Sequence, residues 1–206
     1  MGSVLSIISV NKNFDGTVAL DDFSLDVRKN TITGIIGPNG AGKTTLFNVV
    51  TGFLPADSGR VIYNGKHLDG LKPYLISRLG MARTFQQLRL ITKLSVLDNI
   101  MLSFPNQSGE RITQIFISPR RIKEQEKKNH EKALGYLRYM GIEDKAHALV
   151  EDLSYGQQKM VSLACCLASG ADLLLLDEPV AGINPETIDN ILWSLRNYRK
   201  MGRRLS

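Results

Sequence analysis

The sequence predicts an α/β fold built on a parallel sheet, and two observations carry this prediction. First, the apolar run Thr31–Ile36 is typical of a short buried strand, a glycine-rich loop over 37–44 follows it, and Thr44–Val50 is patterned as a helix. Second, the apolar run Leu173–Leu176 ends in the acidic residues 177–178, as expected of a central parallel strand buried on both faces. We therefore expect a ligand site at the carboxyl ends of these strands.

The glycine-rich loop matches the phosphate-binding pattern G-x-x-x-x-G-K-[ST] at each fixed position. Such a loop directs backbone N–H groups and the positive end of a helix dipole at one point, which favours a phosphate there. Lys43 would place its charge on the β- and γ-phosphates, and the Thr44 hydroxyl would bind Mg²⁺. The loop predicts a P-loop NTPase core (a RecA-like parallel sheet) with these nucleotide-binding residues: Gly37, Pro38, Asn39, Gly40, Ala41, Gly42, Lys43, Thr44 and Thr45.

The acidic pair predicts the remaining chemistry of phosphoryl transfer. Asp177 would hold Mg²⁺, and Glu178 would orient or deprotonate the water that attacks the γ-phosphate. An acidic pair that stood alone would favour a simple helix cap. Its occurrence after an apolar strand, in a chain with a phosphate loop, favours the catalytic interpretation.

A third motif, Leu153–Gln158, has the sequence LSYGQQ and precedes apolar residues at helical spacing. At a helix start, Ser154 could donate its hydroxyl and Gly156 its backbone N–H to a γ-phosphate, although an ordinary N-cap serine is the alternative. The motif resembles the LSGGQ signature of the ATP-binding cassette (ABC) ATPases, with Tyr155 in place of its first glycine. The resemblance implies that Ser154, Gly156 and Gln157 contact nucleotide.

The resemblance to ABC ATPases covers nearly the whole chain. It implies that Phe14 stacks on adenine, with a core side chain as the alternative. It implies that Gln86 contacts Mg²⁺ or the attacking water, with the adjacent Gln87 as a competitor. The segments ARTFQ, LSYGQ and AGxNP are similar to those of the ATPase subunits of branched-chain amino acid importers, where Asn184 departs from the general ABC pattern.

The chain ends before one further expected feature. ABC ATPases carry a strand and a histidine that contacts the γ-phosphate, whereas no histidine follows Glu178 here. We therefore expect a C-terminally truncated unit with weak hydrolysis.

Within one nucleotide-binding domain over 1–206, we expect three parts. Residues 1–91 would form an N-terminal antiparallel β subdomain and the P-loop core, with a hairpin signal at 61–65. Residues 92–152 would form an inserted helical subdomain, whose mixed-charge run 120–128 is expected on a solvated helix face. Residues 153–206 would hold the signature helix, the acidic strand and a following helix.

Composition narrows the functional classes only slightly. The formal net charge of +6 suits a phosphate-rich ligand, an anionic membrane surface or nucleic acid. No apolar run is long enough to span a bilayer. No N-K-x-D motif supports a GTPase.

The predicted function is that of an ABC importer ATPase, which couples ATP binding and hydrolysis to the transport of amino acids, branched-chain ones first, or a related polar solute. ATP and Mg²⁺ are the expected cofactors. The expected partners are a second ATP-binding subunit, identical or paralogous, and membrane permeases, with the chain cytoplasmic and peripheral on the inner face of the membrane and no nucleic acid bound. The alternatives are a soluble ABC ATPase of DNA repair or translation and a regulatory cassette that hardly turns over.

Overall fold

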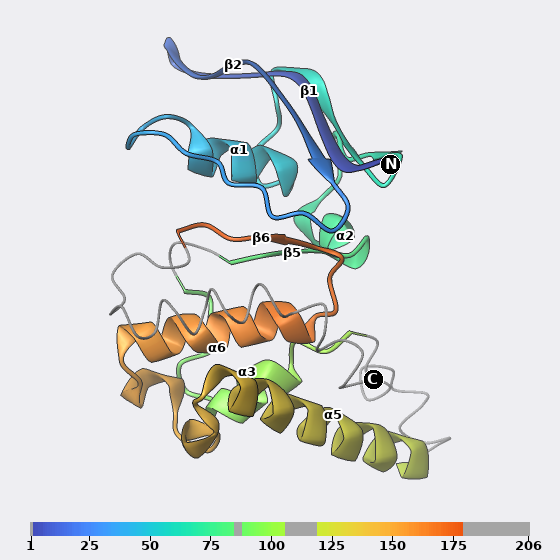
Figure 1. The fold of residues 1–206 in the computed structure, drawn as a ribbon, viewed down its shortest axis with the longest axis vertical. Helices are drawn as coiled ribbons and strands as arrows, with labels where there is room; N and C mark the ends of the chain where they lie inside the picture. The colour runs from blue at the N-terminus through green and yellow to red at the C-terminus, as the bar shows by residue number, and fades with distance from the viewer. Residues whose placement is uncertain (1, 85–87, 106–118, 179–206) are drawn as a thin grey trace. The chain divides into compact units, whose positions relative to one another are not determined.

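A computed structural model describes residues 2–84, 88–105 and 119–178 of this chain (Figure 1). The chain divides into two compact units, Met1–Met81 and Ala82–Ser206.

Unit 1 is built on a four-stranded antiparallel sheet in the order β2-β1-β3-β4. Its strands are β1 (Ser3–Phe14), β2 (Thr17–Arg28), β3 (Ser58–Tyr63) and β4 (Lys66–His67). The two-residue turns 15–16 and 64–65 both have positive φ, as type I′ hairpins require. The predicted hairpin and the predicted antiparallel N-terminal sheet are therefore confirmed.

Two helices complete unit 1, α1 (Lys43–Val50) and α2 (Pro73–Arg78). The predicted helix after the glycine loop is confirmed, and it starts one residue earlier. Proline at the first position of α2 lacks only an N–H that a helix start leaves unpaired. The core of the unit consists of apolar side chains from the sheet and both helices: Val4, Leu5, Ile7, Val10, Leu20, Leu46, Val50, Val61, Tyr63 and Ile76.

The predicted buried strand over Thr31–Ile36 is wrong. The structure forms no strand there, and Ile32 and Ile36 are 78% and 98% exposed. A strand needs a neighbour for its backbone groups, and the sheet order of unit 1 contains no strand that pairs with this segment. The residues of this run favour an extended backbone, but unit 1 offers no neighbouring strand for them to pair with.

Unit 2 packs helices around the signature segment. Its long helices are α5 (Pro119–Met140) and α6 (Tyr155–Ala168), and its short ones are α3 (Val96–Met101), η2 (Glu143–Lys145) and η3 (Val150–Asp152). Figure 1 shows α3, α5 and α6 as a helical layer. Side chains from these three helices form its apolar core: Val96, Leu97, Ile100, Ala133, Leu137, Met140, Met160, Val161, Leu163, Ala164 and Leu167.

A two-stranded sheet of β5 (Met81–Arg83) and β6 (Leu173–Leu175) precedes the acidic pair. The N–H of Thr84 donates to the carbonyl of Leu175 at 3.0 Å, which extends the pairing beyond β5. This pairing places the residues after each strand side by side. It therefore determines what surrounds Asp177.

The charged run on α5 lies at the surface as predicted, because most residues of 120–128 are exposed. Only the apolar stripe further along this helix enters the core. The predicted subdivision at residues 91 and 152 stays a prediction. Among the described helices, none has the length and apolar character that crossing a membrane requires.

Candidate nucleotide and signature sites

The phosphate loop ends in an open helix start. Gly42 is the N-cap of α1, with φ 80° and no side-chain hydrogen bond to cap the helix. The first helical hydrogen bond runs from the N–H of Leu46 to the carbonyl of Gly42 at 2.8 Å. The N–H groups of residues 43–45 therefore precede the intrahelical bonds and can serve an anion, as a helix N-terminus favours.

Glycine at position 42 is required by its surroundings as well as by its φ. A Cβ there would overlap the backbone carbonyl oxygen of Ala19 and lie 3.2 Å from Leu20 on β2. The loop thus packs directly on β2, which positions the start of α1 against the sheet. Gly40 also has positive φ, but a Cβ there would meet nothing within 4 Å.

This difference predicts unequal effects of two alanine substitutions. Gly42→Ala should lower the free energy of unfolding of the nucleotide-free protein by more than about 2 kcal/mol, since left-handed strain and overpacking each cost about 1–3 kcal/mol. Gly40→Ala is the matched control, because it adds the strain without the contact. Urea unfolding measures both, and equal losses would contradict the proposed packing of the loop on β2.

Lys43 lies across the mouth of the loop. Its ammonium donates to the carbonyl of Gly37 at 2.7 Å and to the carbonyl of Pro38 at 2.8 Å. An ammonium has three donors, so these two contacts leave capacity for a phosphate oxygen. The neighbouring Thr44 is exposed at the first turn of α1, where its hydroxyl can reach a ligand.

Phe14 lies at the same end of unit 1 as the phosphate loop. It ends β1 and pairs with Thr17, the first residue of β2, and Gly42 packs two residues further along that strand. The ring is 41% exposed, so Phe14 is not a core side chain. The ammonium of Lys12 is 5.5 Å from the ring centroid and also pairs with Asp57 at 2.6 Å.

The signature segment starts α6 in unit 2 as predicted. Ser154 is the N-cap: its Oγ accepts from the N–H of Gln157 at 3.3 Å, and the Gln157 Oε1 accepts from the N–H of Ser154 at 3.0 Å. N-capping and phosphate contact are the two roles that the sequence allows for this serine, and a hydroxyl that accepts a hydrogen bond still has a proton to donate. The two roles are therefore compatible for Ser154. The Gln157 side chain is engaged in the cap.

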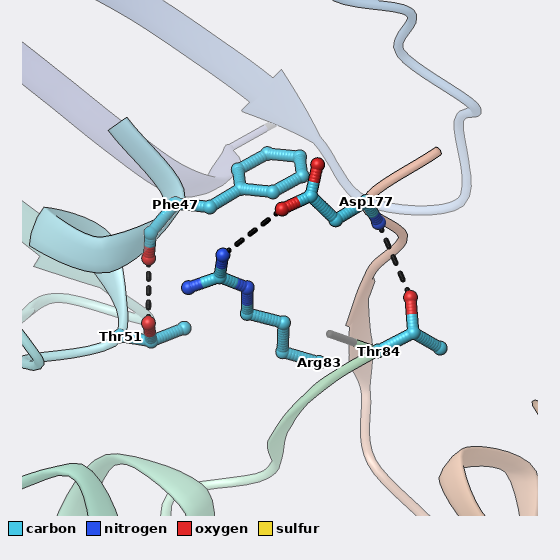
Figure 2. A network of polar contacts seen from close by, with 5 residues as sticks. All are labelled: Phe47, Thr51, Arg83, Thr84 and Asp177. Carbon is cyan, nitrogen blue, oxygen red and sulfur yellow. Dashed lines mark hydrogen bonds and ion pairs between the residues drawn. The ribbon is translucent and has the colours of Figure 1, made fainter. Parts of the chain in front are cut away.

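Asp177 forms a buried ion pair after β6. Its Oδ2 accepts from Nη2 of Arg83 at 3.0 Å, and the two side chains are only 6% and 4% exposed. The N–H of Asp177 donates to Oγ1 of Thr84 at 3.2 Å, so the last residue of β5 and the residue that follows it hold this aspartate (Figure 2). Burial lowers the pKa of Arg83, and the hydrogen bond and charge of Asp177 oppose that shift.

Glu178 follows as an exposed residue with φ 46°, in the left-handed region that non-glycine residues rarely adopt. Its backbone carbonyl accepts from the Lys159 ammonium at 2.9 Å. The acidic pair thus has two different environments. Asp177 is buried and paired, whereas the carboxylate of Glu178 is at the surface.

The predicted site residues fall into the two units. The loop residues and Phe14 belong to unit 1, and the signature and acidic residues belong to unit 2. Gln86, its competitor Gln87 and Asn184 lie outside the described residues. The sequence motifs do not single out Arg83 and Lys159 as site residues, although Arg83 stands in the same ARTFQ segment as Gln86.

The donors present fit a nucleotide phosphate and its metal ion. The left-handed Gly42, the open N–H groups of α1 and the Lys43 ammonium make an anion site. Each unit also carries a hard oxygen ligand of the kind that Mg²⁺ prefers, the Thr44 hydroxyl in unit 1 and the Asp177 carboxylate in unit 2. Among the described residues, no group of three His, Cys, Asp or Glu could hold a metal by itself.

These features define a P-loop nucleotide-binding protein with a capped signature helix. Comparison with known proteins gives the particular family. The family model described as "ABC transporter" matches residues 20–181, so the chain belongs to the ABC transporter family.

Curated relatives with similar sequences are ATP-binding subunits. The chain is 39% identical over 199 residues to the "Probable branched-chain amino acid transport ATP-binding protein LivG" of Archaeoglobus fulgidus, covering 97% of this chain and 76% of that protein. It is 31% identical to the "High-affinity branched-chain amino acid transport ATP-binding protein LivG" of Escherichia coli (strain K12), covering 95% of this chain and 78% of that protein.

Solved structures agree with the fold. A nucleotide-free ATP-binding cassette from an ABC transporter matches with a TM-score of 0.78 and 32% identity, covering 96% of this chain and 78% of that chain. A cassette in its ADP conformation matches with a TM-score of 0.78 and 31% identity, covering 98% and 79%. The predicted α/β class and the predicted membership of the ABC ATPases are confirmed.

Proposed function

We propose that this chain powers the import of branched-chain amino acids as the ATP-hydrolysing subunit of a transporter. The observation that carries the nucleotide role is the open start of α1, with left-handed Gly42 and the Lys43 ammonium at the loop mouth. The solute class rests on the names of the LivG relatives.

Within this proposal, each site residue has a defined task. Lys43 and the α1 N–H groups bind the β- and γ-phosphates, and Phe14 stacks on adenine. Thr44, Asp177 and Gln86 would hold Mg²⁺, which would supply positive charge to the phosphate oxygens. Glu178 accepts a proton from the attacking water, for which its exposed carboxylate is suited.

The signature would complete the site of a second ATP-binding subunit. Ser154 keeps a hydroxyl proton for the γ-phosphate while it caps α6, and Gly156 presents a backbone N–H in the first turn. ATP between the loop of one subunit and the signature of the other couples dimer closure to hydrolysis. Permease subunits would receive this closure, which places the chain at the inner face of a membrane.

A pair of variants tests the shared site. Ser154→Arg should leave ATP binding by the single chain intact but abolish hydrolysis, because the larger side chain fills the γ-phosphate position of the partner's site. Lys43→Ala should weaken ATP binding directly. Mixing the two variants creates one site with neither lesion, so part of the hydrolysis should return. Equilibrium binding and phosphate release measure these effects.

Two results would contradict the proposal. If Ser154→Arg weakens ATP binding by the single chain as much as Lys43→Ala does, the signature is not part of a partner's site. In the transporter assembled with its permeases, Lys43→Ala should also abolish leucine uptake into vesicles. If leucine uptake stays intact although ATP binding is lost, the proposal that this chain powers the import of branched-chain amino acids is refuted.

A further inference from the structure

A buried lysine connects the signature helix to the backbone of Glu178. Lys159 lies on the second turn of α6 and is 9% exposed. A buried ammonium is costly unless hydrogen-bonded or paired with charge. Its contacts include one with the residue after the acidic strand and one with the signature, which belong to different parts of the proposed catalytic machinery.

The first contact is with the end of the acidic strand. The Lys159 ammonium donates to the backbone carbonyl of Glu178 at 2.9 Å. Glu178 has φ 46°, a conformation that costs a non-glycine residue free energy and persists only where surrounding contacts hold it. A charge-assisted hydrogen bond to this residue's own carbonyl is such a contact.

The second contact is with the signature itself. The Lys159 ammonium lies 5.1 Å from the ring centroid of Tyr155, within the range of a cation–π interaction. Tyr155 is one helical turn before Lys159, so both share a face of α6. Tyr155 is 49% exposed and directly follows Ser154, the proposed contact to the partner's nucleotide.

The geometry points to Lys159 as a positioning residue that links the signature of a subunit to the Glu178 of the same subunit. A ligand that moves Tyr155 displaces the ammonium from its contact with the ring and thereby shifts the Glu178 backbone. Engagement of a signature with the partner's nucleotide then alters the carboxylate that acts in the subunit's own site. This inference rests on the proposed function.

Lys159→Met tests this link, because methionine keeps most of the length and removes the charge. We expect kcat to fall about 100-fold, the scale of a catalytic group misplaced by about 1 Å, with the ATP dissociation constant changed less than about twofold because the phosphate loop is untouched. Lys159→Arg, which keeps a cationic donor, should recover most of kcat. Lys128→Met, which removes an exposed lysine of α5, is the control and should leave kcat unchanged.

A double variant distinguishes a Lys159 that positions Glu178 from a Lys159 that only stabilises the fold. If Lys159 acts through Glu178, then Lys159→Met should lower turnover by less than about twofold when Glu178→Gln is already present, since coupled residues are not additive. Full additivity would overturn the inference, as would an unchanged kcat in Lys159→Met. Should Lys159→Met fail to fold, Tyr155→Leu provides the same comparison by removing the ring.

The same set of variants distinguishes the two levels of the proposal. Near-normal turnover in Glu178→Gln alone overturns the proposed role of Glu178, and with it the inference. Lost turnover in Glu178→Gln together with full additivity overturns only the link through Lys159.

Discussion

Replacing Glu178 by glutamine is expected to lower ATP turnover by about two to four orders of magnitude, the usual scale for the loss of a positioned general base. Glutamine has nearly the same shape, so the backbone contact to Lys159 at 2.9 Å should persist. Its amide cannot take the proton from water. ATP binding should remain, because the phosphate-binding residues 37–45 are untouched. Steady-state phosphate release and equilibrium binding measure the two quantities in the intact protein.

A dimer should accumulate in the same variant. Slow hydrolysis prolongs the closed state with ATP between subunits, so sedimentation with ATP should show dimers that the unmodified protein forms only transiently. Glu124→Gln, an exposed glutamate on α5, is the matched control for the chemical change. Near-normal turnover without an ATP-dependent dimer would show that Glu178 is not the base.

Replacing Arg83 by methionine is expected to lower the free energy of unfolding by about 3–5 kcal/mol, the scale for removing one partner of a buried ion pair. Asp177 would then remain buried without the guanidinium that lies 3.0 Å from its carboxylate. Urea unfolding without nucleotide measures this loss. Mg²⁺ with ATP should reduce the loss in Arg83→Met, because a bound divalent cation would neutralise the same carboxylate.

Two further variants show whether the loss of stability in Arg83→Met comes from the buried charge of Asp177. Arg83→Met combined with Asp177→Leu should recover much of the stability, since it removes both buried charges together. Arg138→Met breaks an exposed pair with Glu143 and should cost only a small fraction of the Arg83→Met loss, because solvent screens that pair. If Arg83→Met and Arg138→Met lower the free energy of unfolding equally, burial of the ion pair does not determine the size of the loss.

The candidate site was predictable wherever a motif is continuous in the chain. The phosphate loop, the α1 start and the capped signature helix each lie within a few residues, and turn and capping preferences act over that distance. The hairpin at 61–65 was predictable for the same reason. Phe14 followed from resemblance, and the structure adds that its ring is exposed beside the loop end of β2.

The prediction of a strand over Thr31–Ile36 is wrong because apolar residues are only one of two requirements for a strand. The second requirement is a neighbouring backbone that supplies hydrogen-bond partners, and no strand in the sheet of unit 1 pairs with this segment. Local apolar character gives no information about which segments meet.

By itself, the sequence determined the nucleotide-binding class, the loop that binds phosphate and the helix that presents the signature. Tertiary structure alone decided what surrounds the acidic pair. Arg83 and Asp177 are 94 residues apart, and Lys159 and Glu178 are 19 apart. Such contacts depend on the pairing of β5 with β6 and on the packing of α6. The local periodicity of apolar residues does not specify which distant segments meet. The two cations that contact Asp177 and Glu178 were therefore identified only from the folded chain.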